Sequence, residues 1–349
     1  MIMVVEMKQN ILIILIVMFF VTLIMPIIKK VAVHVNALDI PNERKVHKKS
    51  MPRLGGLGIF FGLLIGYMIF AEENTIMNSI LISSFIIVIT GMIDDINPIK
   101  ARYKFLAQLI AACVIVFYGD IVLDHTTIFG LNINFSYFSI PITLFFILGC
   151  INCINLIDGM DGLAGGISAI YFLTIGIICY LSGGFELQST LCFIMLGSCL
   201  GFLFHNFYPA RIFMGDSGSM LLGLIISVVA LLGFKAATLS SLIIPLLVLA
   251  IPIFDTIFAI IRRKLKKQSI SKADKFHIHH QLLSRTSSQR KTVIIIYIID
   301  LMFAFASITF ALKHYNLSYI MYGIILVLAL IFIFKTNIIY DFKSKKNKK

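Results

Sequence analysis

The sequence contains no tryptophan and few charged residues: 13% of its 349 residues are Asp, Glu, Lys or Arg, whereas 59% are hydrophobic. A soluble domain of ordinary composition carries about 25% charged and about 45–50% apolar residues. A water-soluble core could not bury this much apolar surface, which excludes an ordinary soluble globular protein. A lipid bilayer must therefore cover much of the chain.

The six cysteines form no recognisable metal or disulfide pattern. All of them lie inside apolar stretches, and Cys150 and Cys153 form a CxxC pair with no second pair beside it. Structural zinc sites use four ligands, often in two such pairs. We therefore expect the cysteines to pack as small apolar side chains.

Acidic residues are also scarce: 17 Asp and Glu against 30 Lys and Arg give a net charge of +13. In a soluble protein this excess would suggest nucleic acid binding. Here the basic residues lie in short loops beside apolar runs, where membrane topology requires them. The expected partners are the lipid bilayer, its anionic headgroups or a phosphorylated substrate, and no nucleic acid.

Apolar runs of about 17–25 residues, the length that a transmembrane helix needs, recur along the chain. The first run, Ile11–Ile28, is too long for the apolar core of a cleaved signal, and no small-residue cleavage site follows it. We predict about eleven transmembrane helices, near residues 10–32, 54–71, 77–93, 103–119, 137–155, 163–182, 187–205, 216–234, 238–262, 291–313 and 316–336. The predicted fold class is all-α: a polytopic membrane protein with a single transmembrane catalytic domain over residues 1–349.

The distribution of basic residues predicts how these helices are oriented. With the N-terminus outside, the inner loops and the helix ends beside them (29–53, 94–104, 156–162, 206–215, 262–291 and the tail from Lys335) contain 27 of the 30 Lys and Arg residues. The positive-inside rule therefore predicts an outer N-terminus and a cytoplasmic C-terminus in the cell membrane. The predicted cytoplasmic segments are the loops 33–53, 94–102, 156–162, 206–215 and 263–290 and the basic tail 336–349.

The first inner loop combines phosphate donors with glycines. Its candidate phosphate-binding residues are Arg44, Lys45, His47 and Arg53. Gly55, Gly56 and Gly58 follow, where a backbone without side chains can approach a ligand or another helix. The alternative is a basic loop that only sets topology.

Two adjacent carboxylates, Asp94 and Asp95, end the third apolar run. They repel each other unless a cation lies near them, and a hard divalent ion such as Mg²⁺ fits oxygen ligands of this kind. The alternative is a solvated helix end whose carboxylates pair with the basic residues that follow, Lys100, Arg102 and Lys104.

A third segment has polar residues at every third position of an apolar run: Asn152, Asn155, Asp158 and Asp161. Each step of three turns the side chain by about 60° on an ideal helix, so the four cannot all face one point. We expect Gly159 and Gly162 to unwind the helix end and turn these groups toward a shared site. Amides and carboxylates there supply oxygen ligands and general-base candidates, and Asn152 is a candidate substrate-binding residue.

The fourth segment contains Gly-Asp-Ser-Gly at 215–218, which invites a serine-protease interpretation with Ser217 as nucleophile. That interpretation fails, because such a protease has no place in a bundle of eleven membrane helices. Asp216 stands instead where an apolar run begins. It either caps backbone N–H groups or holds Mg²⁺ beside a phosphate drawn to the helix N-terminus.

The longest inner loop contains three histidines within four residues, His277, His279 and His280. No cysteine or carboxylate pair with zinc-ligand spacing accompanies them. Beside Lys272 and Lys275, they fit better as donors to a diphosphate. We expect Asp255, about two turns before Arg262, to face the same cytoplasmic cleft.

Taken in this order, the five segments resemble the polyprenyl-phosphate N-acetylhexosamine-1-phosphate transferases of glycosyltransferase family 4. The likeness extends from Asp39 to Leu283 and is greatest to bacterial enzymes that begin wall teichoic acid, O-antigen or common-antigen synthesis. The resemblance implies transfer of a sugar 1-phosphate from a UDP-N-acetylhexosamine to undecaprenyl phosphate, with release of UMP. UDP-GlcNAc is the default donor, UDP-GalNAc or another modified N-acetylhexosamine remains open, and the implied cofactor is Mg²⁺ or Mn²⁺.

The resemblance also implies roles for individual residues. Asn155 and Asp216 match the metal ligands. Asp94, Asp95, Asp158 and Asp161 match residues implicated in catalysis, with metal or nucleotide-sugar binding as further roles. Lys45 and His47 match positions near the lipid phosphate, and His277, His279 and His280 match a loop near the nucleotide diphosphate. Because the UDP-sugar is cytosolic and the polyprenyl tail stays in lipid, we expect the site to open toward the cytoplasm.

Three other functions compete with this one. Phospho-MurNAc-pentapeptide transferases usually carry a different histidine loop, so the stretch 273–280 favours the simple-sugar branch. A secondary transporter would hold its polar residues near the bilayer midplane in broken helices, not at inner helix ends. A catalytically dead lipid-binding protein is disfavoured because every acidic motif is intact.

Overall fold

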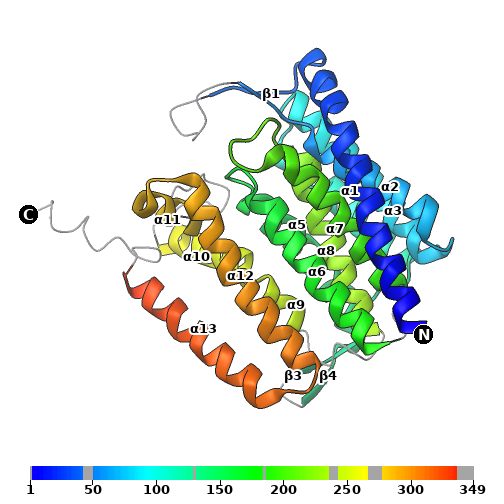
Figure 1. Ribbon diagram of the computed structural model, residues 1–349, viewed down its shortest axis with the longest axis vertical. Helices are drawn as coiled ribbons and strands as arrows, with labels where there is room; N and C mark the ends of the chain where they lie inside the picture. The colour runs from blue at the N-terminus through cyan, green and yellow to red at the C-terminus, as the bar shows by residue number, and fades with distance from the viewer. Residues whose placement is uncertain are drawn as a thin grey trace, which may run out of the picture. The chain divides into compact units, whose positions relative to one another are not determined.

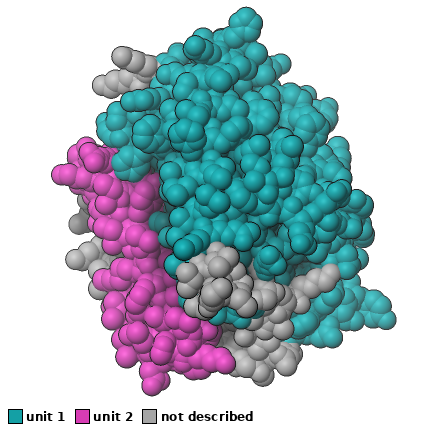
Figure 2. Space-filling view, turned by 45° about the vertical axis from the view of Figure 1, so that its right-hand side comes forward, with its two compact units in different colours: residues 1–245 teal, residues 246–349 magenta. Residues whose placement is uncertain are grey.

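The structure, a computed structural model, describes residues 2–41, 50–128, 131–183, 186–235, 243–265 and 277–335. The chain forms two compact units, residues 1–245 and 246–349 (Figure 2). The sequence prediction of one catalytic domain across both units stays a prediction.

In its described residues, unit 1 contains eight long helices and two short hairpins. The helices are α1 (Ile2–His34), α2 (Gly55–Phe70), α3 (Thr75–Ile96), α4 (Ala101–Cys113), α5 (Ser139–Ile157), α6 (Leu163–Ser182), α7 (Glu186–Asn206) and α8 (Gly215–Lys235). A π-helical segment, η1 (Val114–Tyr118), continues α4, and a short 3₁₀ turn, η2 (Ser136–Phe138), precedes α5. The long helices run side by side, with β1 at one end and the β3–β4 hairpin at the other (Figure 1).

The hairpins are antiparallel and short. Strand β1 (Leu38–Asp39) pairs with β2 (Met51–Pro52), and Asp39 lies opposite Met51. Strand β3 (His125–Ile128) pairs with β4 (Leu131–Asn134). Arg53, directly after β2, bridges Phe213, so the first loop and the segment before α8 lie together.

Local sequence explains where the key helices begin and end. Asn74 caps α3 by accepting a hydrogen bond from the Met77 amide at 2.8 Å. Helix α5 ends at Ile157, before Gly159, and Gly162 has a φ of 79°, which glycine adopts readily. The predicted unwinding of this helix end is therefore present.

Helix α8 forms the centre of unit 1. Of its apolar stretch, 94% is buried, and it contacts α2, α3, α5, α6 and α7. Gly56 on α2 and Gly91 on α3 make these contacts close, because a Cβ at either position would collide with the backbone of Ser217 or Gly218. The first turn of α8 is therefore held between two neighbouring helices.

Unit 2 is also helical. It contains α10 (Ala250–Leu265), α11 (Ile278–Thr286), α12 (Gln289–Ala311) and α13 (Tyr315–Lys335), and α9 (Ile243–Val248) lies at its boundary with unit 1. Helix α12 contacts α10, α11 and α13. An apolar core of Ala250, Phe303, Ala306 and Ile325 joins three of these helices.

The prediction of one helix over 238–262 is wrong. Its described part consists of α9 and α10, with a turn at Leu249. Pro252 has no amide N–H for the Val248 carbonyl, and its ring is incompatible with a continuous helix there. The break is therefore built into the sequence.

The described chain is mostly helical, as predicted for a multi-pass membrane protein. Within the described residues, eight helices are long and apolar enough to cross a membrane, and Gly55–Phe70 and Tyr315–Leu328 are shorter apolar helices. The count of about eleven spans and the orientation of the termini stay predictions.

Candidate active site

The first turn of α8 is capped by a carboxylate from another helix. Asp95, near the end of α3, accepts hydrogen bonds from the amides of Asp216 at 2.9 Å and Ser217 at 3.2 Å. It also accepts one from the Ser217 hydroxyl at 2.9 Å. The Asp95 side chain is fully buried. Asp95 therefore satisfies free N–H groups at the start of α8. This N-capping role usually belongs to a residue at the start of the same helix.

Gly215 makes this contact between α3 and α8 possible. Its φ is 75°, in the left-handed region, and a Cβ at this position would collide with the Asp95 carboxylate. The Asp95 cap therefore depends on the absence of a side chain at Gly215. The Asp216 side chain is left available for other contacts.

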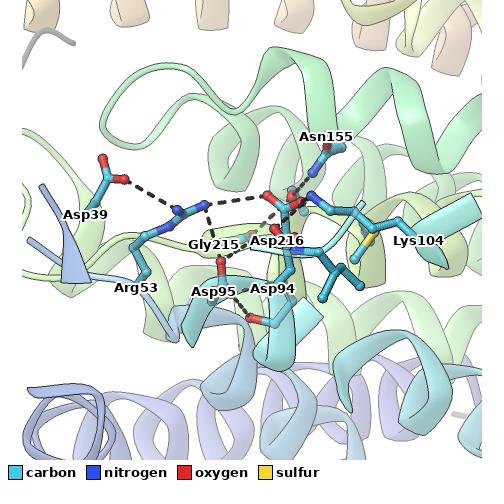
Figure 3. A network of polar contacts seen from close by, with 12 residues as sticks. Asp39, Arg53, Asp94, Asp95, Lys104, Asn155, Gly215 and Asp216 are labelled. Carbon is cyan, nitrogen blue, oxygen red and sulfur yellow. Dashed lines mark hydrogen bonds and ion pairs between the residues drawn. The ribbon is translucent and has the colours of Figure 1, made fainter. Parts of the chain in front are cut away.

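Two cationic side chains lie against the acidic cluster (Figure 3). Lys104 Nζ lies 2.7 Å from Asp94 Oδ2 and 2.7 Å from Asp216 Oδ2. Arg53 Nη2 lies 3.3 Å from Asp95 and 3.6 Å from Asp216. Segments from α2's leading loop, α3, α4 and α8 therefore meet in one network of opposite charges.

Arg53 is held firmly in its charged form. Its Nη1 also lies 3.4 Å from Asp39 on β1. Burial alone would lower the pKa of Arg53, but the carboxylates of Asp95, Asp39, Asp216 and Asp158 outweigh it and raise the pKa above its ordinary value. The first inner loop thus contributes a permanent positive charge.

Asn155 joins the network from α5. Its Nδ2 donates a hydrogen bond to Ser219 Oγ at 2.8 Å, and Ser219 Oγ donates to the Gly215 carbonyl at 3.0 Å. This contact uses the amide nitrogen, so the carbonyl oxygen of Asn155 remains for a ligand. Asn152, one turn earlier, donates instead to Gln108 of α4 at 3.0 Å.

The two aspartates after α5 lie in different surroundings. Removal from water and the nearby Asp216 raise the pKa of Asp158 to about 7, although Arg53 acts in the opposite direction. Asp161 accepts a hydrogen bond from the Ala210 amide at 3.0 Å. Asp161 therefore joins the loop after α5 to the loop before α8.

The predicted histidine cluster lies in unit 2. His277 Nδ1 is 2.9 Å from Asp255 Oδ2, and the rings of His279 and His280 are 4.4 Å apart. His277 and His279 are buried. Asp255, expected at a cytoplasmic cleft, is buried against these histidines.

Some predicted residues lie outside the described residues, and one important residue was not predicted. Lys45 and His47, the candidates for the lipid phosphate, fall in the segment 42–49. The sequence pattern indicated Lys104 only as one of three basic residues that follow Asp94 and Asp95. Its position in the second turn of α4 decides which of the three reaches Asp94 and Asp216.

The acidic network is not a ready-made cage for a metal ion. Among the described parts of the chain, no three His, Cys, Asp or Glu side chains form a group that could hold one. Asn155 and Asp216 nevertheless offer hard oxygen donors from two helices that meet at Ser219. Of the three clustered carboxylates, Asp216 has the most exposed side chain, at 18% against 7% for Asp94 and none for Asp95.

Comparison with known proteins identifies clear relatives. A family described as "Glycosyl transferase family 4" matches residues 77–234. A Bacillus subtilis protein named "Probable undecaprenyl-phosphate N-acetylglucosaminyl 1-phosphate transferase" is 43% identical, over 82% of this chain and 81% of the relative.

Two more distant relatives have related names. "Undecaprenyl-phosphate alpha-N-acetylglucosaminyl 1-phosphate transferase" of Haemophilus influenzae is 32% identical, over 79% of each chain. "Decaprenyl-phosphate N-acetylglucosaminephosphotransferase" of Mycobacterium tuberculosis is 31% identical, over 78% of this chain and 75% of the relative.

Proposed function

The chain belongs to glycosyl transferase family 4, and from this we propose that it transfers N-acetylglucosamine 1-phosphate from UDP-N-acetylglucosamine to undecaprenyl phosphate, releasing UMP. The observation that carries the proposal is the 43% identity to the Bacillus subtilis relative, over four fifths of both chains. The names of the relatives favour this reaction over transfer of phospho-MurNAc-pentapeptide. The position of the acidic network also supports an enzyme over a transporter. Its residues lie at helix ends, whereas transporters bind their substrates near the bilayer midplane in broken helices.

We further propose that about eleven segments cross the membrane, with the N-terminus outside and the site facing the cytoplasm. The charge distribution supports this orientation, because 27 of the 30 Lys and Arg residues then lie on the inner side. The ends of α3 and α5 and the start of α8 would all lie at that surface. A charged, cytosolic UDP-sugar and a membrane-bound lipid phosphate can meet there.

Mg²⁺ is the proposed cofactor, held by Asn155 and Asp216. Mg²⁺ is usually bound by one or two carboxylates plus substrate phosphates and waters, so a small protein donor set suits it. The Asn155 carbonyl oxygen and the Asp216 carboxylate would form such a set, and the contact of Lys104 Nζ with Asp216 Oδ2 at 2.7 Å supports a positive charge beside this carboxylate. Such an ion, or Mn²⁺ in its place, would supply Lewis-acid neutralisation of the diphosphate.

The reaction requires one P–O bond to form and one to break. An oxygen of the undecaprenyl phosphate attacks the β-phosphorus of the UDP-sugar, and the bond to the bridging oxygen breaks with its electron pair leaving on UMP. A phosphate monoester has a second pKa of about 6, so the attacking oxygen is already largely ionised at neutral pH. We therefore propose that the main role of Asp94 is to orient Lys104, and that removal of a proton is secondary.

The basic residues neutralise charge that develops during transfer. Lys104 and Arg53 lie at the acidic cluster and, once a substrate binds, can donate hydrogen bonds to its phosphate oxygens. Asp158 and Asp161 are proposed to contact the nucleotide sugar. Lys45 and His47 are proposed for the lipid phosphate, and the histidine cluster for the nucleotide diphosphate.

A direct assay tests this function. Purified protein is incubated with radiolabelled UDP-GlcNAc and undecaprenyl phosphate, with and without EDTA, and lipid-linked label and UMP are measured. We expect equal amounts of both products, and neither in EDTA. Uptake of labelled UDP-GlcNAc into sealed vesicles without UMP would instead indicate a transporter.

A further inference from the structure

Both oxygens of the Asp216 carboxylate lie beside a cationic side chain. Lys104 Nζ donates a hydrogen bond to Asp216 Oδ2 at 2.7 Å, and Arg53 Nη2 lies 3.6 Å from Asp216 Oδ1. A divalent ion at this carboxylate would be repelled by both side chains, because like charges this close interact strongly. Asp216 can therefore bind such an ion tightly only when one of the two cations moves away.

Arg53 is the cation that is fixed in place. Its guanidinium also contacts two other carboxylates, with Nη1 3.4 Å from Asp39 and Nη2 3.3 Å from Asp95. Its backbone is fixed as well, because the Arg53 amide donates a hydrogen bond to the Ala37 carbonyl at 2.9 Å. The contact with Asp216, at 3.6 Å, is the longest of its three ion pairs. Arg53 therefore has little reason to leave this position.

Lys104 can leave Asp216 without losing its other partner. Its Nζ lies 2.7 Å from Asp94 Oδ2, and Asp94 is anchored separately, because its Oδ1 accepts a hydrogen bond from the Ile99 amide at 2.9 Å. A lysine ammonium group has three donors on a flexible four-carbon stem. The Lys104 side chain is 25% exposed, so a ligand from solvent can reach it. The ammonium group can thus turn about Asp94 while α4 stays in place.

We propose that Lys104 is an exchangeable counter-ion of Asp216. It neutralises this carboxylate until a nucleotide sugar binds, and it then turns to the diphosphate while it keeps its contact with Asp94. This movement frees Asp216 for a divalent cation when the diphosphate arrives. The cation and the nucleotide therefore bind cooperatively, and each strengthens binding of the other by the same factor. This role of Lys104 depends on the proposed function and adds to it the coupling between the two ligands.

The alternative is that Lys104 stays in place as a permanent brace between α3, α4 and α8. A permanent ammonium group repels a divalent cation equally with and without nucleotide, so Lys104→Gln would raise metal affinity by the same factor in both states. An exchangeable counter-ion has already left Asp216 in the nucleotide complex. Lys104→Gln then raises metal affinity only in the absence of nucleotide, and the coupling between metal and nucleotide decreases.

The test uses full-length protein purified in detergent, with Mn²⁺ and UDP as probes. Mn²⁺ affinity is measured by electron paramagnetic resonance without UDP and at saturating UDP, and Mn²⁺ bound by free UDP is subtracted from a titration without protein. In the wild type we expect UDP to strengthen Mn²⁺ binding on the order of 10- to 100-fold. In Lys104→Gln, Mn²⁺ should bind about tenfold more tightly than in the wild type without UDP, but no more tightly at saturating UDP.

Two variants test whether the effect belongs to this one ammonium group. Lys104→Arg retains the positive charge, so its Mn²⁺ affinity without UDP should equal that of the wild type. Lys100→Gln is the matched control, because it removes one positive charge from an exposed side chain at the start of the same helix. Lys100→Gln should change neither Mn²⁺ affinity nor its dependence on UDP.

Equal strengthening of Mn²⁺ binding with and without UDP in Lys104→Gln would overturn the inference, and so would unchanged or weaker binding without UDP. Should Lys104→Gln not fold, Lys104→Met, with an uncharged chain of similar length, takes its place under the same criteria. Independent binding of UDP and Mn²⁺ to the wild type would overturn the inference equally. Failure of the proposed function is a separate result, namely no UMP release by wild-type protein, and the binding measurements do not depend on turnover.

Discussion

Asp95→Asn should disconnect α3 from the start of α8. The carboxylate accepts two backbone amides and one hydroxyl, and it lies 3.3 Å from Arg53. An asparagine keeps one acceptor and turns an NH₂ group toward the remaining donors, so at least one buried amide is left unpaired. With the weakened ion pair to Arg53, we expect a loss of about 2–4 kcal/mol in stability.

Asp95→Asn should also weaken metal binding at the proposed metal site. Asp216 itself carries one of the capped amides, so a displaced helix start moves its carboxylate. Supporting residues of metal sites typically change metal affinity by about 10- to 100-fold, and we expect Mn²⁺ affinity to fall in that range. The assay combines thermal unfolding in detergent, Mn²⁺ titration by electron paramagnetic resonance and UMP release.

Two variants make this prediction specific. Gly215→Ala adds only a methyl group, but the methyl would collide with the Asp95 carboxylate, so it should reproduce both losses. Asp94→Asn retains an acceptor for the Ile99 amide and leaves the cap intact, so it should lower turnover without the same loss of stability. An Asp95→Asn protein with wild-type unfolding and Mn²⁺ affinity, but reduced turnover, would refute the capping role and indicate a catalytic one.

Three other predictions concern the same network. Ser219→Ala should weaken Mn²⁺ binding about tenfold by freeing the Asn155 amide to rotate, and unchanged binding would show that Ser219 does not orient it. Lys104→Gln should raise the KM for UDP-GlcNAc about 10-fold or more, with partial recovery in Lys104→Arg, and an unchanged KM would exclude the phosphate contact. Because the pKa of Asp158 is raised to about 7, this carboxyl is protonated below that pH, so Mn²⁺ affinity should increase as the pH rises through 7. Asp158→Asn should remove that dependence, and a variant that retains it would assign the titration to another group.

The sequence predicted the polar ends of the helices because carboxylates and amides are conspicuous in apolar runs. It also predicted that the four polar residues of 152–161 could not all face one point of a regular helix, and that an unwound helix end would turn them toward a shared site. In the structure Asn152 contacts Gln108, whereas Asn155 contacts Ser219, so these two do not share one partner. The unwound end of α5 followed from Gly159 and Gly162 in the same way.

Other features could not be predicted because they depend on contacts between distant segments. The capping of α8 by Asp95 requires α3 and α8 to pack closely, which no local pattern encodes. The sequence left open whether Asp216 caps this helix start or holds Mg²⁺, and it did not indicate Asp95 as the cap. Lys104 could not be distinguished from Lys100 and Arg102 without the direction in which α4 faces.

Metal binding by Asn155 and Asp216 is tested by measuring Mn²⁺ binding to the wild type, Asn155→Ala and Asp216→Asn, in the absence of substrate and with UDP-GlcNAc. We expect one tight site per chain in the wild type with UDP-GlcNAc, weakened in Asn155→Ala and abolished in Asp216→Asn. Full Mn²⁺ binding in Asp216→Asn would show that the cation is held elsewhere and that Asn155 and Asp216 do not form its site.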